Sequence, residues 1–165
     1  MAISETTRQR LETQGFTGLD VARLAEVESW LRFTPAVCAF LMGVGTALAS
    51  PAFLWALAAV AAMGAIFPAH PFDLVYNFAV RRLTSTHALP PNGAPRRFAC
   101  GLAAVWLSAT GAVFWADAAV VGYAMGGLLT VMASIVALTH FCIPSLIYGA
   151  LFGRGRRAPT AALNE

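Results

Sequence analysis

Cysteine and histidine side chains, which could act as nucleophiles or metal ligands, gather near the ends of long apolar segments in this sequence. His140 and Cys142 are separated by one residue, and Asp73 lies three positions after His70. Thiolates are nucleophiles, and imidazoles exchange protons near neutral pH. We therefore take six residues as candidate functional residues: Cys142, His140, Cys100, His70, Asp73 and Arg97.

The spacing of these residues does not define a catalytic or metal site. The sequence has three cysteines but no Cys-x-x-Cys pair and no paired ligand spacing. We therefore predict no metal, no cofactor and no assignable catalytic residue. A cysteine in a membrane helix is commonly a small apolar filler, and His70 can form a cap or hydrogen bonds beside Asp73. We favour a protein that is not an enzyme, with acid–base chemistry by His70, Asp73 and Tyr76 as an alternative.

Composition indicates that these residues sit in a membrane protein. Of the 165 residues, 58% are hydrophobic and 12% are charged, whereas a soluble domain usually has about 25% charged residues. The mean hydropathy is +0.67. All 11 basic residues are arginines, and they flank the apolar segments. The net charge of +3 therefore indicates membrane topology and predicts no nucleic-acid partner.

Four apolar segments predict an all-α fold of four transmembrane helices arranged as two helical hairpins. The expected spans cover residues 33–49, 52–67, 98–115 and 118–141. About 20 helical residues cross a bilayer core, so the first two spans are short and need tilt or flanking residues. A re-entrant first hairpin is the alternative. The membrane domain covers residues 33–153, with the lipid bilayer as its surroundings.

The arginines predict the orientation of the spans. Basic clusters precede the first span, lie between the second and third, and follow the fourth, whereas the two short turns have no arginine. Positive charge marks the cytoplasmic face, so an even number of crossings places both termini there. Residues 1–32 form a cytosolic or interfacial segment with an amphipathic helix on the membrane surface, which Asp20 could cap. Residues 154–165 form an Arg-rich cytosolic tail.

Small residues within the spans predict close helix packing. Gly122 and Gly126 form a G-x-x-x-G pattern, which in a four-helix protein favours packing within the molecule over a dimer interface. The two halves also resemble each other, because an Arg-Phe pair opens each and a His near a Pro ends each. A parallel internal repeat would produce this echo, and so would the usual residues at the ends of membrane helices.

Two short motifs carry a resemblance to a known family. The segment PRRFA at residues 95–99 and the segment THFCIPSLIY at residues 139–148 flank two apolar spans. In this respect residues 66–153 resemble the bacterial domain-of-unknown-function 4395 family of small integral membrane proteins. The resemblance implies a bacterial inner-membrane location and no assigned activity. Some members carry a second Cys where Ser145 stands here, which argues against a dithiol mechanism.

Taken together, the sequence predicts a structural or partner-binding helical bundle, with a membrane-complex partner. The alternative is a small transporter or a redox or sulfur-handling protein. Its site would lie at the cytoplasmic face and use Cys142, His140, Cys100 and the charge of Arg97. The membrane parts of some sulfurtransferases are similar to this kind of chain, which is the analogy behind that alternative.

Overall fold

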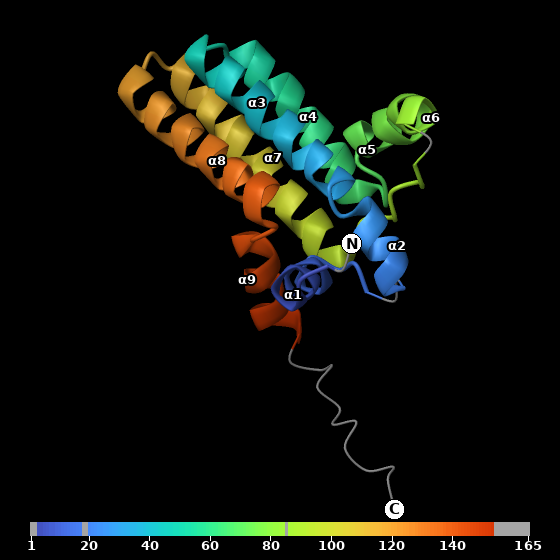
Figure 1. The fold of residues 1–165 in the computed structure, drawn as a ribbon. Helices are drawn as coiled ribbons and strands as arrows, with labels where there is room; N and C mark the ends of the chain where they lie inside the picture. The colour runs from blue at the N-terminus through green and yellow to red at the C-terminus, as the bar shows by residue number, and fades with distance from the viewer. Residues whose placement is uncertain (1–2, 18–19, 85, 154–165) are drawn as a thin grey trace, which may run out of the picture.

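The computed structural model describes residues 3–17, 20–84 and 86–153, and the regular structure in these ranges is helical (Figure 1). The elements are α1 (Glu5–Thr13), α2 (Val21–Val27), the 3-10 helix η1 (Trp30–Arg32), α3 (Phe33–Ala47), α4 (Pro51–Ile66), α5 (Pro71–Val75), the π-helix η2 (Tyr76–Val80), α6 (Arg81–Thr84), α7 (Ala94–Trp115), α8 (Ala119–Thr139) and α9 (Ile143–Phe152). The predicted all-α fold class is confirmed. The predicted Arg-rich tail, residues 154–165, lies outside the described residues.

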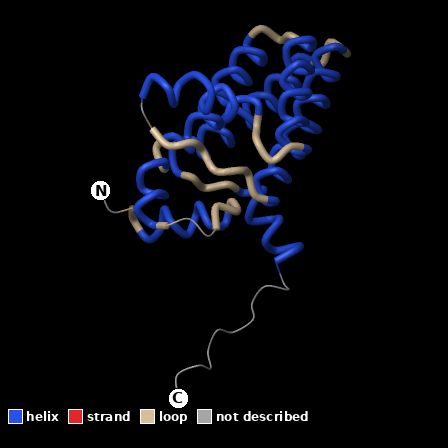
Figure 2. The backbone as a smooth tube through the Cα atoms, turned by 90° about the vertical axis from the view of Figure 1, so that its right-hand side faces the viewer, coloured by secondary structure: helices blue, strands red, loops and turns tan. Residues whose placement is uncertain are grey.

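The four longest helices, α3, α4, α7 and α8, lie side by side and form a bundle (Figure 1). The most extensive packing joins α4 to α7 and α3 to α8, whereas helices that follow each other in sequence touch less. Figure 2 shows the same bundle from the side, with the loops that connect its helices. The grouping of the spans into two hairpins therefore stays a prediction.

Tight turns join the bundle helices at one end of the molecule. Ala49 and Asp117 have positive φ angles of 45° and 56°, so each reverses the chain in the left-handed region. Ser50 then caps α4 by accepting a hydrogen bond from the amide of Phe53, and Pro51 occupies its first turn. The helices α1, α2, α5 and α9 gather at the opposite end (Figure 1).

Three helical segments in the described ranges are long and apolar enough to cross a membrane: Trp30–Ala47, Ala94–Trp115 and Ala119–Thr139. Pro51–Ile66 meets that standard only together with Pro71–Thr84, and these two parts are bent by 81°. The structure thus has three to four candidate spans, where the sequence predicts four. The 16 residues of α4 extend about 24 Å, short of a hydrocarbon core of about 30 Å.

Close contacts in the bundle depend on small residues. A Cβ on Gly126 would lie 2.3 Å from Thr46 Oγ1 on α3, and one on Gly122 would lie 2.6 Å from the Phe114 ring on α7. Both glycines are buried. The predicted use of the G-x-x-x-G pattern within the molecule is therefore confirmed. A core cluster surrounds these contacts and contains Met42, Leu54, Ala58, Ala61, Leu107 and Phe114.

The N-terminal helices α1 and α2 cover one end of the bundle (Figure 1). Leu24 and Val27 of α2 and Leu31 of η1 are buried in a second cluster. This cluster is made of Leu11, Phe16, Leu24, Val27, Leu31, Tyr76 and Leu89. The predicted helix is present, and its buried apolar residues pack against the protein itself. Its placement on the membrane surface stays a prediction. Asp20 occupies the N-cap position of α2, as expected, but its side chain makes no capping hydrogen bond.

Candidate functional site

A buried carboxylate lies at the junction of α3, α5 and the loop before α7. Asp73 is 3% exposed. Its Oδ1 accepts a hydrogen bond of 2.6 Å from the Thr34 hydroxyl, and its Oδ2 accepts bonds from the Asn92 amide at 2.8 Å and the His70 backbone N–H at 3.2 Å. A buried charge is stable only when it is paired and hydrogen-bonded in this way. We call this group, with Arg96, the Asp73 cluster.

Arg96 provides the positive charge of the Asp73 cluster. Its Nη2 lies 3.8 Å from Asp73 Oδ1, and the side chain is 9% exposed. The guanidinium carbon also lies 5.2 Å from the centre of the Phe16 ring, which is a cation–π distance. Since Phe16 comes from the segment after α1, Arg96 connects the N-terminal cover to the bundle.

His70 acts as the N-terminal cap of α5. Its Nδ1 accepts a hydrogen bond from the Phe72 amide, while the Asp73 side chain accepts one from the His70 amide, so the two residues form a capping box. Burial lowers the pKa of His70 to about 4. A neutral ring is also what this bond requires, because a protonated Nδ1 could not accept it.

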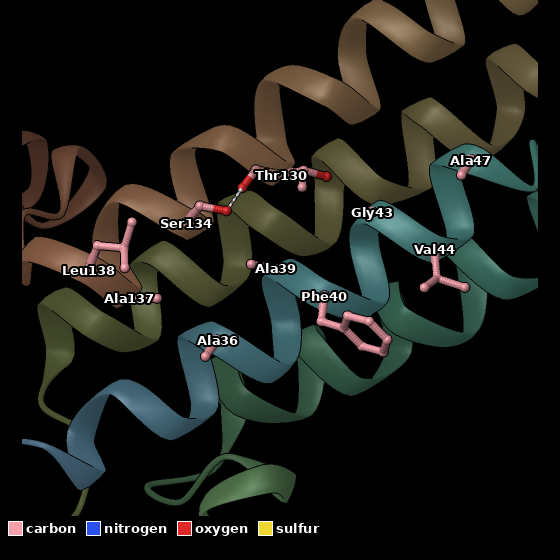
Figure 3. A pocket seen from close by; sticks show the side chains of 10 residues that line it. All are labelled: Ala36, Ala39, Phe40, Gly43, Val44, Ala47, Thr130, Ser134, Ala137 and Leu138. Atoms are coloured by element: carbon pink, nitrogen blue, oxygen red, sulfur yellow. Dashed lines mark hydrogen bonds between the residues drawn. The ribbon is translucent and has the colours of Figure 1, made fainter.

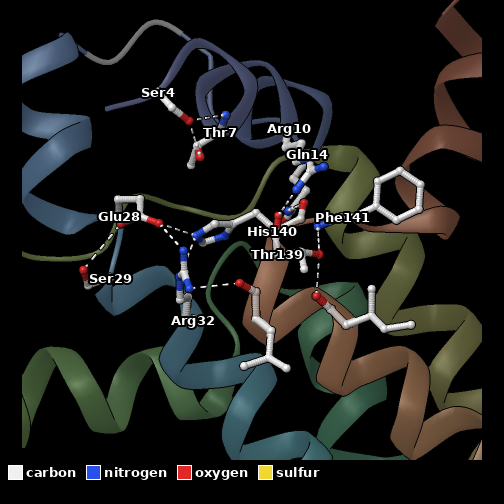
Figure 4. A network of polar contacts seen from close by, with 12 residues as sticks. Ser4, Thr7, Arg10, Gln14, Glu28, Ser29, Arg32, Thr139, His140 and Phe141 are labelled. Atoms are coloured by element: carbon white, nitrogen blue, oxygen red, sulfur yellow. Dashed lines mark hydrogen bonds and ion pairs between the residues drawn. The ribbon is translucent and has the colours of Figure 1, made fainter. Parts of the chain in front are cut away.

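A second polar group, the His140 cluster, lies where α8 ends (Figure 4). His140 has a positive φ of 56° and closes α8 in the left-handed conformation. Its Nε2 lies 3.0 Å from Arg32 Nε and 2.9 Å from Glu28 Oε1. Nε2 can accept from Arg32 or donate to Glu28, but it cannot do both, so the tautomer or charge of the ring decides which bond forms.

The ionisable groups of the His140 cluster have shifted pKa values. Burial lowers the pKa of His140, although the hydrogen bond with Glu28 opposes that effect. Burial raises the pKa of Glu28, but hydrogen bonds from Arg32 and His140 outweigh it, so the pKa of Glu28 is lowered overall. The Arg32–Glu28 contact measures 2.6 Å. The cluster is therefore most stable as an ion pair beside a neutral imidazole.

Arginines and a glutamine bind the free carbonyl groups at two helix ends. Arg32 donates to the carbonyl of Leu138, Arg10 to that of Thr139, and Gln14 to that of His140. Arg97 does the same for α4, donating to the carbonyls of Ala65 and Ile66 at 2.9 and 2.6 Å. Cations are favoured at helix C-termini by the unpaired carbonyls and the helix dipole. Arg97 is thus placed to stabilise α4.

The three cysteines carry free thiols and are half-buried. Cys142 stands just before α9 without capping it, and it lines a pocket of about 240 Å³ between α1 and the end of α8. The residues that line this pocket are Thr6, Gln9, Arg10, Thr13, Gln14, His140, Phe141, Cys142 and Leu146. We call it the Cys142 pocket.

The predicted candidate residues lie at several separate sites in the structure. His70 and Asp73 share one cluster, and His140 and Cys142 share the Cys142 pocket. Cys100 lies within α7, and Arg97 is bound to α4. In the described ranges no group of three or more His, Cys, Asp and Glu side chains is arranged to hold a metal ion.

Sequence reasoning missed several partners of the candidate residues. Thr34 and Asn92 bind Asp73 across 39 and 19 positions, and Glu28 reaches His140 across 112. One feature of the sequence could have indicated such a partner: the pair Arg96-Arg97 at the start of an apolar segment. An arginine buried there requires a buried acid. Asp73 is the acid that meets that requirement.

An apolar groove of about 590 Å³ runs along the outside of the bundle between α3 and α8 (Figure 3). Its floor consists of small residues, and Phe40 and Leu138 stand at its rim, exposed by 69% and 71%. The two hydroxyl groups in it are already bonded within α8, from Thr130 to Gly126 and from Ser134 to Thr130. The groove therefore presents an apolar surface, and we call it the α3/α8 groove.

These features define the class of the protein: an all-helical bundle with three to four candidate membrane spans and buried polar clusters at one end. The family that carries the description "Domain of unknown function (DUF4395)" matches residues 28–152, and the chain belongs to this family. The resemblance seen in the sequence is thereby confirmed. Neither the curated proteins nor the solved structures include a match to this chain.

Proposed function

We propose that this chain is a four-span protein of the bacterial inner membrane that binds a membrane helix of a partner protein in the α3/α8 groove. The groove carries this proposal. Helices associate in lipid through close packing at small residues rather than through a hydrophobic drive. Ala36, Gly43 and Ala47 lie on one side of the groove and Ala137 on the other, so a partner helix could approach the backbone closely there.

Photo-crosslinking in native membranes tests the groove. A photoreactive amino acid at Phe40 lies at the rim of the groove, and one at Val105 on α7 is equally exposed, at 70% against 69%, but lies outside it. We expect position 40 to give one discrete protein adduct and position 105 to give lipid adducts only. A matching pattern at both positions would contradict the proposal. An adduct of twice the chain mass of 17.4 kDa would identify a second copy instead.

Filling the groove provides the matched variant. A leucine in place of Gly43 would occupy the groove, since the nearest contact of a Cβ there is an ordinary 3.5 Å to Thr130. A leucine in place of Gly127 meets nothing within 4 Å. The adduct at position 40 should disappear in Gly43→Leu and persist in Gly127→Leu. Its persistence in both would place the partner elsewhere.

The topology that we propose has both chain ends and the loop at residues 86–93 on the cytoplasmic side. In support, α1, α9 and this loop lie at one end of the bundle, and the two arginine-free turns lie at the other (Figure 1). Carrying the arginines across hydrocarbon is costly, so their side should remain in the cytosol.

We also propose a parallel internal repeat that relates α3–α4 to α7–α8. The packing of α3 on α8 and of α4 on α7 is what a two-fold axis along the membrane normal would generate. The arginine contacts agree with it. Arg32, just before α3, caps α8, and Arg97, in the first turn of α7, caps α4.

A second function is favoured by the Cys142 pocket: binding or transport of a sulfur species or another small anion at the cytoplasmic face. The pocket brings the Cys142 thiol near Arg10 and His140. Thiol labelling in sealed vesicles, with and without sulfite or thiosulfate, tests this function. We expect labelling of Cys142 to slow when the ion is present and to vanish in Cys142→Ala. Labelling that neither ion changes would count against this second function.

A further inference from the structure

The segment from α5 to α6, residues 71–84, lies across the direction of the bundle. It is bent by 81° from α4, and it projects from the end of the molecule where the N-terminal helices gather (Figure 1). A helix at this angle to a membrane-spanning helix runs nearly parallel to the bilayer plane. Since it begins five residues after the end of α4, it lies at the level where hydrocarbon meets the headgroups.

The polarity of this segment is the reverse of that of a surface helix in water. Its polar side chains Asp73 and Tyr76 are buried, and the Tyr76 hydroxyl is hydrogen-bonded to Thr86 at 2.7 Å. Four of its large apolar side chains are exposed, whereas Phe72 and Val80 are half-buried. Their exposed fractions are 43% for Leu74, 52% for Val75, 65% for Phe78 and 87% for Leu83. Several large apolar side chains exposed along one short segment indicate an apolar environment.

Two arginines accompany this face without acidic partners. Within the described residues, Arg8, Arg32 and Arg96 pair with carboxylates, and neither Arg81 nor Arg82 makes such a pair. Arg82 is exposed and directly precedes Leu83. An interfacial helix with apolar residues on one side and arginines at its edge has the complementary charge for anionic headgroups.

We propose that residues 71–84 form a binding surface for anionic phospholipid, in which Leu74, Val75, Phe78 and Leu83 enter the acyl region and Arg81 and Arg82 bind the headgroup phosphate. The surface rests on the proposed embedding of the bundle in a bilayer, and it is independent of the α3/α8 groove. It would anchor the bent end of α4 and so compensate for the short length of that helix.

Native mass spectrometry of the full chain, released from nanodiscs that contain phosphatidylglycerol and phosphatidylcholine in equal amounts, tests this surface. We expect phosphatidylglycerol to be retained preferentially. In the double variant Arg81→Gln/Arg82→Gln, its binding should weaken by roughly thirtyfold, since each arginine near an anionic surface contributes about a factor of five. The control Arg8→Gln/Arg23→Gln has the same change of net charge and should bind as the wild type does.

Two further measurements distinguish binding of a whole lipid from binding of phosphate alone. The variant Phe78→Ser/Leu83→Ser should lose phosphatidylglycerol while remaining helical by circular dichroism, because both side chains are exposed. Inorganic phosphate at millimolar concentration should not displace the lipid. Equal retention of the two lipids, an unchanged Arg81→Gln/Arg82→Gln variant, or displacement by phosphate would overturn the proposal. None of these outcomes bears on crosslinking at position 40, so the two proposals fail separately.

Discussion

At the scale of single residues, the carboxylate of Asp73 accepts most of the buried hydrogen bonds at the end of the bundle that the N-terminal helices cover. It accepts bonds from Thr34, Asn92 and the His70 backbone, and it faces Arg96. Arg96 is 7% exposed and has no other carboxylate near it among the described residues. Removal of the Asp73 charge would leave a buried guanidinium without its counter-charge.

We therefore predict that Asp73→Asn destabilises the protein by about 3 kcal/mol, the usual range when one partner of a buried ion pair is removed. Thermal unfolding of the purified protein in detergent measures this effect. Asp117→Asn is the matched control, because Asp117 is exposed and asparagine also tolerates its left-handed backbone. Equal melting temperatures for the two variants would mean that Asp73 and Arg96 do not depend on each other.

The capping role of His70 predicts a dependence on pH. Burial lowers its pKa to about 4, with Arg96 adding to the shift and Asp73 opposing it. The unfolded chain, with a histidine pKa of about 6.5, then binds more protons than the folded chain between these values. Stability should be full above about pH 6.5 and should fall as the pH drops toward 4.

Melting temperatures at about pH 7.5 and about pH 5 measure this loss, and substitutions assign it. Asparagine is a good N-cap and does not titrate, so His70→Asn should reduce the loss. Part of the loss of stability should remain in His70→Asn, because the pKa of His140 is also lowered. A loss of the same size in the wild type and in His70→Asn would remove His70 from the explanation.

The sequence allowed only part of this residue-level picture to be predicted. His70 and Asp73 were identified as a local hydrogen-bonded pair because the spacing of a capping box is short and visible in the sequence. Arg96, Thr34 and Asn92 were not identified, because their distances along the chain from Asp73 carry no periodic pattern. Only the packing of α3 and the loop before α7 brings them together.

At the scale of helices, the packing of α8 on α3 depends on the absence of a side chain at one position. A Cβ at Gly126 would lie 2.3 Å from Thr46 Oγ1 and 3.0 Å from Thr46 Cβ, so the two helices would have to separate. We predict that Gly126→Ala destabilises the bundle by about 1–3 kcal/mol, as overpacking usually does. Unfolding in detergent, followed by far-UV circular dichroism, measures this change.

The neighbouring glycine provides the control for this prediction. Gly127 has nothing within 4 Å of its Cβ position, and alanine favours a helix more than glycine does. Gly127→Ala should therefore be neutral or slightly stabilising. If both substitutions had the same effect, helix propensity rather than contact with Thr46 would explain the result.

The sequence predicts the long apolar helices of the bundle better than it predicts the short N-terminal helices. Hydropathy reveals a helix that faces lipid, and α7 and α8 satisfy that rule by themselves. The sequence does not predict the polar helix α1, and it does not reveal the packing of α2 on the protein. An amphipathic helix has the same pattern whether its apolar face meets lipid or the cluster around Leu11 and Tyr76.

At the scale of the whole molecule, the bundle has two unlike ends. One end carries only the turns around Ala49 and Asp117, while the other carries the arginine contacts and both polar clusters. Charge and hydrogen bonding are thus concentrated on one side of the apolar helices. A membrane orientation that places this end in the cytosol satisfies the positive-inside rule with all the described arginines at once.

Accessibility mapping tests this orientation. In a variant whose three cysteines are replaced by alanine, a single cysteine at Pro90 should react with a membrane-impermeant maleimide only after spheroplasts are opened. A cysteine at Ala118, in the opposite turn, should react in intact spheroplasts, because it is exposed at the arginine-free end. Detergent should make both positions react, which controls for burial. If the cysteine at position 90 reacted in intact spheroplasts, the chain would cross an odd number of times before α7. With the N-terminus in the cytosol, α4 and the bent segment at residues 71–84 would then form a re-entrant pair that returns to the outer face, with Arg81 and Arg82 carried there.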